Sequence, residues 1–79
     1  MKKVVVRVND LLHKYNMSIS ELHIRTGIRR AALSELANGK RERIQFEHIE
    51  QIANTLSIED IRDIITFVEV PGDFEELEN

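Results

Sequence analysis

The sequence predicts a compact all-α domain of five short helices. Three observations support this fold class: 79 residues suffice for one domain only, apolar residues recur at helical spacing, and capping residues and glycines divide the chain between the apolar segments. Small domains often need a covalent or metal staple, or an oligomer, for stability. The chain has no cysteine, which excludes a disulfide or a thiolate metal site in that role.

The first two helices are defined by spacing and by their ends. We expect the first to end near Asn16, and its apolar residues at helical spacing are Val8, Leu11, Leu12 and Tyr15. Ser18 and Glu21 have the form of a capping box, which starts the second helix. Gly27 ends that helix, because glycine adopts positive φ at little cost.

The third helix is expected over residues 29–37, with Leu33 and Leu36 facing inward. Asn38 and Gly39 provide a left-handed stop for it. A charged loop follows, and then a fourth helix whose apolar face consists of Phe46, Ile49, Ile52, Ala53 and Leu56.

The end of the domain allows two interpretations. A second capping pattern at residues 57–60 predicts a fifth helix, whereas residues 66–70 alternate and are rich in β-formers. Residues 4–8 alternate too, so a small two-stranded antiparallel pairing of the N- and C-terminal segments would close the domain. We therefore expect one domain at residues 1–70 and a solvated acidic tail at residues 71–79.

Charge is distributed unevenly along the chain. The formal net charge is −3, but residues 69–79 hold five acids and no base, which leaves 11 bases against 9 acids in residues 1–68. Residues 25–43 hold six bases against two acids, and residues 44–63 hold one base against five acids. The net charge therefore does not exclude a nucleic acid partner, although DNA-binding proteins usually carry a basic surplus.

Two short helices around a glycine turn, the second opening with adjacent arginines, are typical of helix-turn-helix readers of the DNA major groove. Thr26-Gly27-Ile28 and then Leu33-Ser34-x-Leu36-x-Asn38-Gly39-Lys40 resemble the turn, recognition helix and stop of the lambda-repressor-like, Xre-type (Cro-like) family. The resemblance covers about residues 6–66. It implies a lambda-repressor-like DNA-binding domain whose partner is double-stranded DNA.

Two positions depart from the family pattern. Ile19 stands where the family commonly has a glutamine that helps to fix a phosphate, so one expected DNA contact is missing. His23 stands where the family commonly has a small residue at the crossing of the two helices, and it favours a wider crossing.

The start of the predicted third helix has a feature that packing does not explain. Arg29 and Arg30 lie at a helix N-terminus, where the macrodipole disfavours each cation by about 0.3 to 1 kcal/mol. A recognition helix supplies a reason, because arginine binds guanine O6 and N7 in bidentate fashion, and the small Ala31 and Ala32 keep the helix slim. Two solvated arginines are the alternative interpretation. The expected base-reading residues are Arg29, Arg30, Ala31, Ser34 and Glu35.

Phosphate contacts are expected around the same helix. Cations in a loop beside a docked helix release counterions at little cost, although an ordinary solvated loop would carry the same charges. Ser18 caps a helix whose first amides could hold a phosphate, but the cap alone accounts for a serine there. The expected set is Ser18, Asn38, Lys40, Arg41 and Arg43.

Enzyme signatures are absent from the sequence. The three histidines lack metal-ligand spacing, and there is no glycine-rich phosphate loop or nucleophile elbow, so we expect no catalysis, metal or cofactor. The longest apolar run near the N-terminus has three residues, too few for a signal peptide or a membrane span, and we expect a cytoplasmic protein with no membrane partner.

The expected function is a sequence-specific transcriptional regulator, most simply a repressor. One recognition helix covers only a few base pairs, so useful specificity requires a homodimer on two half-sites. The alternative is an antitoxin or antirepressor-type interaction module with the same fold, whose acidic tail binds a basic protein partner.

Overall fold

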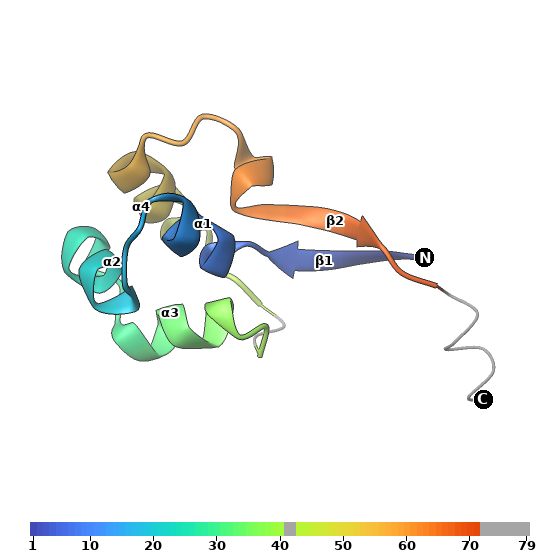
Figure 1. Ribbon diagram of the computed structural model, residues 1–79, viewed down its shortest axis with the longest axis horizontal. Coiled ribbons are helices and arrows are strands. Elements are labelled where there is room, and N and C mark those ends of the chain that lie inside the picture. Colours follow the sequence, from blue (N-terminus) through green and yellow to red (C-terminus); the bar gives the residue numbers. More distant parts are fainter. Residues whose placement is uncertain (41–42, 72–79) are drawn as a thin grey trace.

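The computed structural model describes residues 1–40 and 43–71. Helices gather into a bundle, and a two-stranded sheet extends away from them (Figure 1). In chain order the elements are β1 (Lys2–Val6), α1 (Val8–Lys14), α2 (Ile19–Thr26), α3 (Arg30–Ala37), α4 (Phe46–Leu56), the 3₁₀ helix η1 (Ile61–Asp63) and β2 (Ile65–Glu69).

The all-α, five-helix prediction is wrong, because the described residues form four α-helices and a two-stranded sheet. Ser57 does not start a fifth helix: it has φ 56° and ends α4 in the left-handed region. Residues 58–60 belong to no helix or strand. Asp60 is extended, and its side chain accepts a hydrogen bond from the Arg62 amide and caps a 3₁₀ helix of only three residues. Strand pairing with β1 outcompetes the helix that the apolar spacing suggested.

The antiparallel pairing of the chain ends is confirmed, but β1 covers residues 2–6 rather than 4–8, because Val8 already begins α1, and β2 begins one residue earlier than expected. β1 and β2 pair with Lys2 opposite Glu69 and Val6 opposite Ile65. The Arg7 amide also donates to the Ile64 carbonyl, 2.6 Å away, which joins the start of α1 to the start of β2. The sheet is thereby fixed to the helical bundle at its base.

The core lies between the helices and the base of the sheet. Phe46 was expected on the buried face of α4, but it is 79% exposed. It is the first residue of the helix, and the buried positions of α4, Ile52 and Leu56, lie in its second half. The ten buried apolar residues are Val8, Leu11, Leu22, Ile28, Ala32, Leu33, Leu36, Ile52, Leu56 and Ile64.

Most helix ends agree with the predicted caps. Ser18 Oγ accepts from the Glu21 amide, and the Glu21 carboxylate accepts from the Ser18 amide, both over 3.1 Å. Gly27 closes α2 with φ 79°. At the end of α3, Gly39 alone is left-handed, with φ 69°, whereas Asn38 has φ −91°.

Some expectations concern parts of the chain that the structure does not describe. Apart from Pro71, the predicted tail at residues 71–79 lies outside the described residues. Within residues 1–40 and 43–71, no helix is long and apolar enough to cross a membrane. The same residues contain no group of three or more His, Cys, Asp or Glu side chains that could hold a metal ion.

Candidate nucleic-acid interface

The turn between α2 and α3 is held by two side chains of α2. Thr26 is buried, and its hydroxyl donates to the Leu22 carbonyl over 2.7 Å and accepts from the Ile28 amide over 3.1 Å. His23 Nδ1 lies 2.7 Å from the Ile28 carbonyl oxygen. A carbonyl oxygen can only accept, so Nδ1 carries the proton in this contact. These bonds fix the direction in which α3 leaves the turn.

Sequence reasoning missed both of these roles. Thr26 was noted only as part of the turn motif, and His23 only as a bulky residue at the helix crossing. The signal available for Thr26 is its position one residue before Gly27, where a hydroxyl can bond to the carbonyl four residues earlier. Nothing in the sequence indicates the His23 bond, because it depends on the path of the turn.

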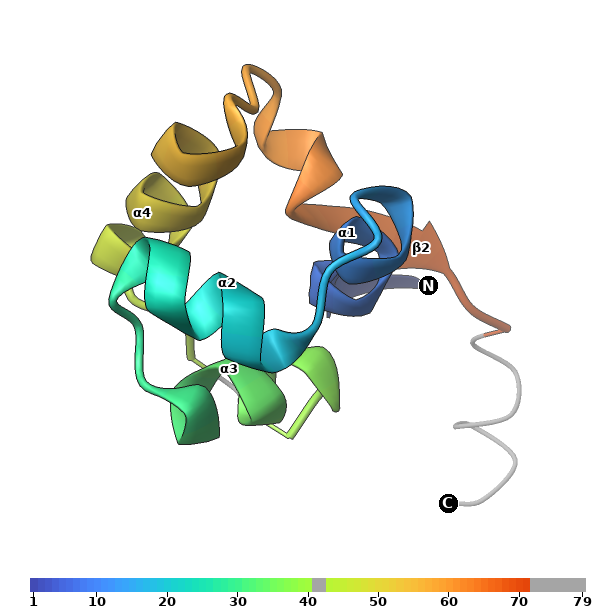
Figure 2. The same ribbon diagram turned by 60° about the vertical axis from the view of Figure 1, so that its left-hand side comes forward.

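α3 packs one face on the core and exposes the other. Leu33 and Leu36 are buried, as predicted, and Ala32 is buried with them at 4% exposure, so it does not stand beside the arginines on the outer face. Ala31 and Glu35 lie one turn apart on the exposed face. Figure 2 shows α3 at the edge of the bundle, with α2 on its inner side. The outer face of α3 is therefore accessible to a large partner.

The first turn of α3 presents two exposed arginines. Arg29 is in an extended conformation at the N-cap, and its side chain makes no cap hydrogen bond, so the helix begins at Arg30 rather than at the expected Arg29. Within the part of the chain that the structure describes, neither Arg29 nor Arg30 forms an ion pair. Their charges are therefore not neutralised by a described carboxylate.

The remaining residues expected on α3 differ in exposure. Glu35 is exposed, whereas Ser34 is half-buried. The Ser34 hydroxyl accepts a long hydrogen bond, 3.5 Å, from the side-chain nitrogen Nδ2 of Asn38. Ser34 was expected to contact a base and Asn38 a phosphate. The structure brings these two side chains together on one stretch of the helix.

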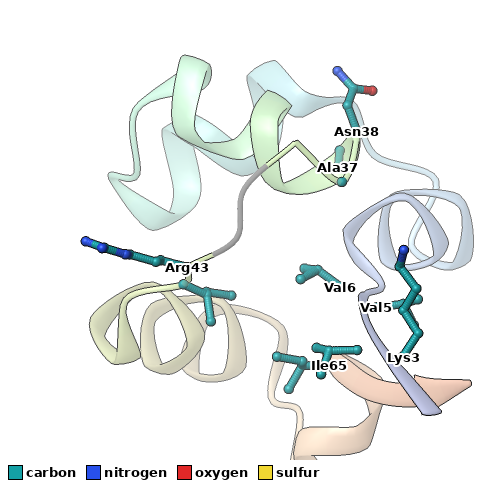
Figure 3. A pocket seen from close by; sticks show the side chains of 10 residues that line it. Lys3, Val5, Val6, Ala37, Asn38, Arg43 and Ile65 are labelled. Carbon is teal, nitrogen blue, oxygen red and sulfur yellow. The ribbon is translucent and has the colours of Figure 1, made fainter. Parts of the chain in front are cut away.

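The expected phosphate-contacting residues do not form one cluster. Figure 3 shows Asn38 and Arg43 on opposite sides of a cleft of about 650 Å³, with their polar ends directed away from it. Lys40 is exposed, Arg41 lies outside the described residues, and the Ser18 hydroxyl is engaged in its capping box. Any shared phosphate-binding role must therefore be spread along the nucleic acid backbone.

A second cleft joins the start of α3 to the start of α4. Its volume is about 300 Å³, and both N-cap residues, Arg29 and Gln45, line it. Neither N-cap side chain makes a capping hydrogen bond, so the first amides of both helices lack this partner. His48 also lines the cleft, and its Nδ1 is buried without a hydrogen-bond partner. Two helix N-termini and the Arg29 guanidinium bring positive charge to this cleft, and Glu47 is the one acidic residue in its lining.

Gln45 and His48 were not identified from the sequence as site residues. Their relevance depends on how α4 approaches the turn before α3, a contact between segments distant in the chain. The absence of a good N-cap residue at Gln45 is the only local signal.

Comparison with known protein families shows to which family the chain belongs. A family model described as the Cro/C1-type HTH DNA-binding domain matches residues 7–69. The chain belongs to this family. The match includes all four α-helices and β2, whereas β1 precedes it.

One relative of this Cro/C1-type domain is a Bacillus subtilis (strain 168) protein described as an uncharacterized HTH-type transcriptional regulator, YozG. The two are 38% identical over 53 residues, which are 67% of this chain and 63% of the relative. The alignment thus spans less than two thirds of the relative's length. No solved structure matches the chain significantly.

Proposed function

We propose that this Cro/C1-type domain is a sequence-specific transcriptional regulator that reads the DNA major groove with α3, and that it represses by occupying promoter DNA. The observation that carries the proposal is the exposed pair Arg29 and Arg30 at the start of α3. Helix energetics disfavour cations there, and neither arginine forms an ion pair with a described carboxylate. Contact with DNA explains their presence.

The outer face of α3 supplies donors, an acceptor and a methyl group for base edges. Arg29 and Arg30 suit guanine O6 and N7, and Glu35 suits the amino group of cytosine. The small Ala31 allows close approach and can touch a thymine methyl group. Ser34 contributes through its hydroxyl, which accepts a long hydrogen bond from the Asn38 side chain.

Phosphate contacts flank this base-reading face. Lys40 and Arg43 are exposed cations beyond the end of α3, and Arg41 belongs to the same loop sequence. Asn38 and the start of α2 at Ser18 add neutral contacts. At the other end of α3, the cleft between Arg29 and Gln45 offers backbone amides to a phosphate.

A single α3 covers only a few base pairs, so the regulator acts as a homodimer on two half-sites whose centres lie about 10 base pairs apart. The name of the Bacillus subtilis relative supports a regulatory role. A DNA partner also agrees with the cytoplasmic location expected from the sequence.

Selection of bound sequences from a random pool of double-stranded DNA tests this function. We expect enrichment of one motif composed of two inverted half-sites. Binding that persists in the pool without enriching any motif, by a chain shown to be folded, would contradict sequence-specific regulation.

A further inference from the structure

One face of the sheet exposes a pair of large apolar side chains. Val4 and Phe67 lie directly opposite each other on β1 and β2. They are 54% and 64% exposed, respectively. Exposed apolar pairs of this kind on an ordered element commonly mark an interaction surface.

The strand register places these two side chains close together. Arg7 donates a backbone hydrogen bond to Ile64, and bonded and non-bonded pairs alternate along an antiparallel ladder. Counting along the register from Arg7 and Ile64, Val4 and Phe67 form a non-bonded pair, in which side chains approach most closely. Val4 and Phe67 therefore form one continuous apolar patch, which we call the Val4–Phe67 face.

A cleft adjoins this face on the side of η1. Its volume is about 420 Å³, and its lining residues are Val4, Arg62, Ile65, Thr66 and Phe67. Three of these five are apolar, so the cleft can accept an apolar side chain such as another phenylalanine.

We propose that a second copy of this chain docks on the Val4–Phe67 face, so that two domains pair through their sheets about a two-fold axis. The inference rests on the proposed function, which requires two copies on DNA, and it specifies the surface that joins them. The sheet extends away from the bundle, and α3 belongs to the bundle (Figure 1). A two-fold axis through the sheets therefore leaves both α3 helices uncovered.

The charges around the patch favour a copy of the chain over a strongly charged partner. Lys2 and Glu69 form the next pair along the same face, 3.4 Å apart. Glu69 also pairs with the N-terminal ammonium of the same copy, 3.6 Å away, so each copy presents exposed groups of both signs beside its apolar patch. A two-fold axis can place Lys2 of one copy near Glu69 of the other, which is the self-complementarity of an isologous interface.

The size of the patch predicts a weak dimer. A buried phenylalanine removes about 150 to 250 Å² from solvent, so two Phe67 and two Val4 side chains bury less than the roughly 1,200 to 2,000 Å² of a stable interface. We therefore expect DNA to strengthen the association by holding two copies side by side.

Two glutamate variants test the interface on DNA. Phe67→Glu and Val68→Glu introduce the same charge at neighbouring positions of β2, but on opposite faces of the sheet. On DNA with two selected half-sites, we expect Phe67→Glu to lower the apparent affinity about tenfold or more, and Val68→Glu to bind as the wild type binds. On a single half-site the two variants should bind equally. Equal binding of both variants on two half-sites would overturn the proposed face.

A second measurement needs no DNA and stands even if the proposed function fails. The sequence contains no cysteine. A single introduced thiol therefore reports on one position. At high protein concentration, a short bismaleimide should link Val4→Cys into covalent dimers faster than Lys3→Cys, its neighbour on the opposite face. Equal rates for the two variants would refute the interface, with thermal melting confirming that both are folded.

Discussion

Asn9 donates a hydrogen bond from Nδ2 to the carbonyl oxygen of Ala37 over 2.9 Å, and so ties the start of α1 to the last residue of α3. The Ala37 carbonyl is one of the groups at the C-terminal end of α3 that lack a partner within the helix. Asn9 therefore fixes the far end of α3, while Thr26 and His23 fix the turn before it.

Removal of the Asn9 amide should weaken the fold. Asn9→Ala is expected to lower the free energy of unfolding by about 1 kcal/mol, the usual net value of one hydrogen bond. Urea denaturation followed by circular dichroism measures the change. Asn54→Ala is the matched control, because Asn54 is exposed on α4 and its side chain forms no hydrogen bond within the described residues. Equal losses in the two variants would show that the bond to Ala37 contributes nothing.

The Thr26 hydroxyl should be more important than its methyl group. Thr26→Val keeps the shape but leaves the Ile28 amide without its partner, which costs about 1 to 3 kcal/mol for a buried donor. Thr26→Ser retains the hydroxyl and should be the more stable of the two variants. The comparison uses the same denaturation measurement, and a more stable Thr26→Val would contradict this assignment.

The ion pair after α4 should be visible in an acid titration. Hydrogen bonds from Arg62 lower the pKa of the Asp60 carboxyl from 3.8 to about 2. Because the pKa is lowered in the folded protein, the pair stabilises the fold at pH values above the ordinary pKa of 3.8. This contribution to stability is lost as the pH falls toward 2. Carboxyl carbon shifts measured by NMR should give a midpoint near 2, and Arg62→Ala should return it toward 3.8. Arg7→Ala, which removes a different ion pair, should leave the midpoint unchanged.

Helices with strong local signals were predictable from the sequence, and so was the pairing of the chain ends. The α2 boundaries follow from the Ser18 capping box and Gly27, whose effects act within one turn of the helix. The prediction of a fifth helix was wrong, although the apolar spacing at Ile61 and Ile64 fits a helix locally. The decisive interaction there is the pairing of β2 with β1, which comes from the other end of the chain.

The candidate site was predictable only where it lies on one element. The arginines of α3 stand out because they contradict helix energetics, and this signal is local. The bonds of His23 and Asn9, and the cleft shared by Arg29 and Gln45, depend on how separate helices approach one another. Periodicity and capping rules do not contain that information.

The acidic C-terminal segment should weaken DNA binding through its charge. Removal of residues 71–79 leaves 11 basic and 10 acidic residues, a formal net charge of +1 in place of −3. At low salt, we expect the truncated protein to bind non-specific DNA more tightly than the full chain does. At about 1 M salt, where the Debye length is about 3 Å, the two proteins should bind equally. Salt titrations of fluorescence anisotropy give both affinities. A fall in melting temperature with no change in low-salt affinity would instead assign the segment a structural role.

Parallel selections with two arginine variants test base readout by α3 most directly. Arg30→Ala removes a group expected at a base edge, and it should cost about 1 to 3 kcal/mol and relax the preference at one base pair of each half-site. Arg43→Ala removes an expected phosphate contact, so it should weaken all sequences alike, reduce the salt slope by about 1 and leave the selected motif unchanged. If Arg30→Ala selects the same motif as the wild type, with a loss of affinity that is uniform across sequences, α3 does not read the bases through Arg30.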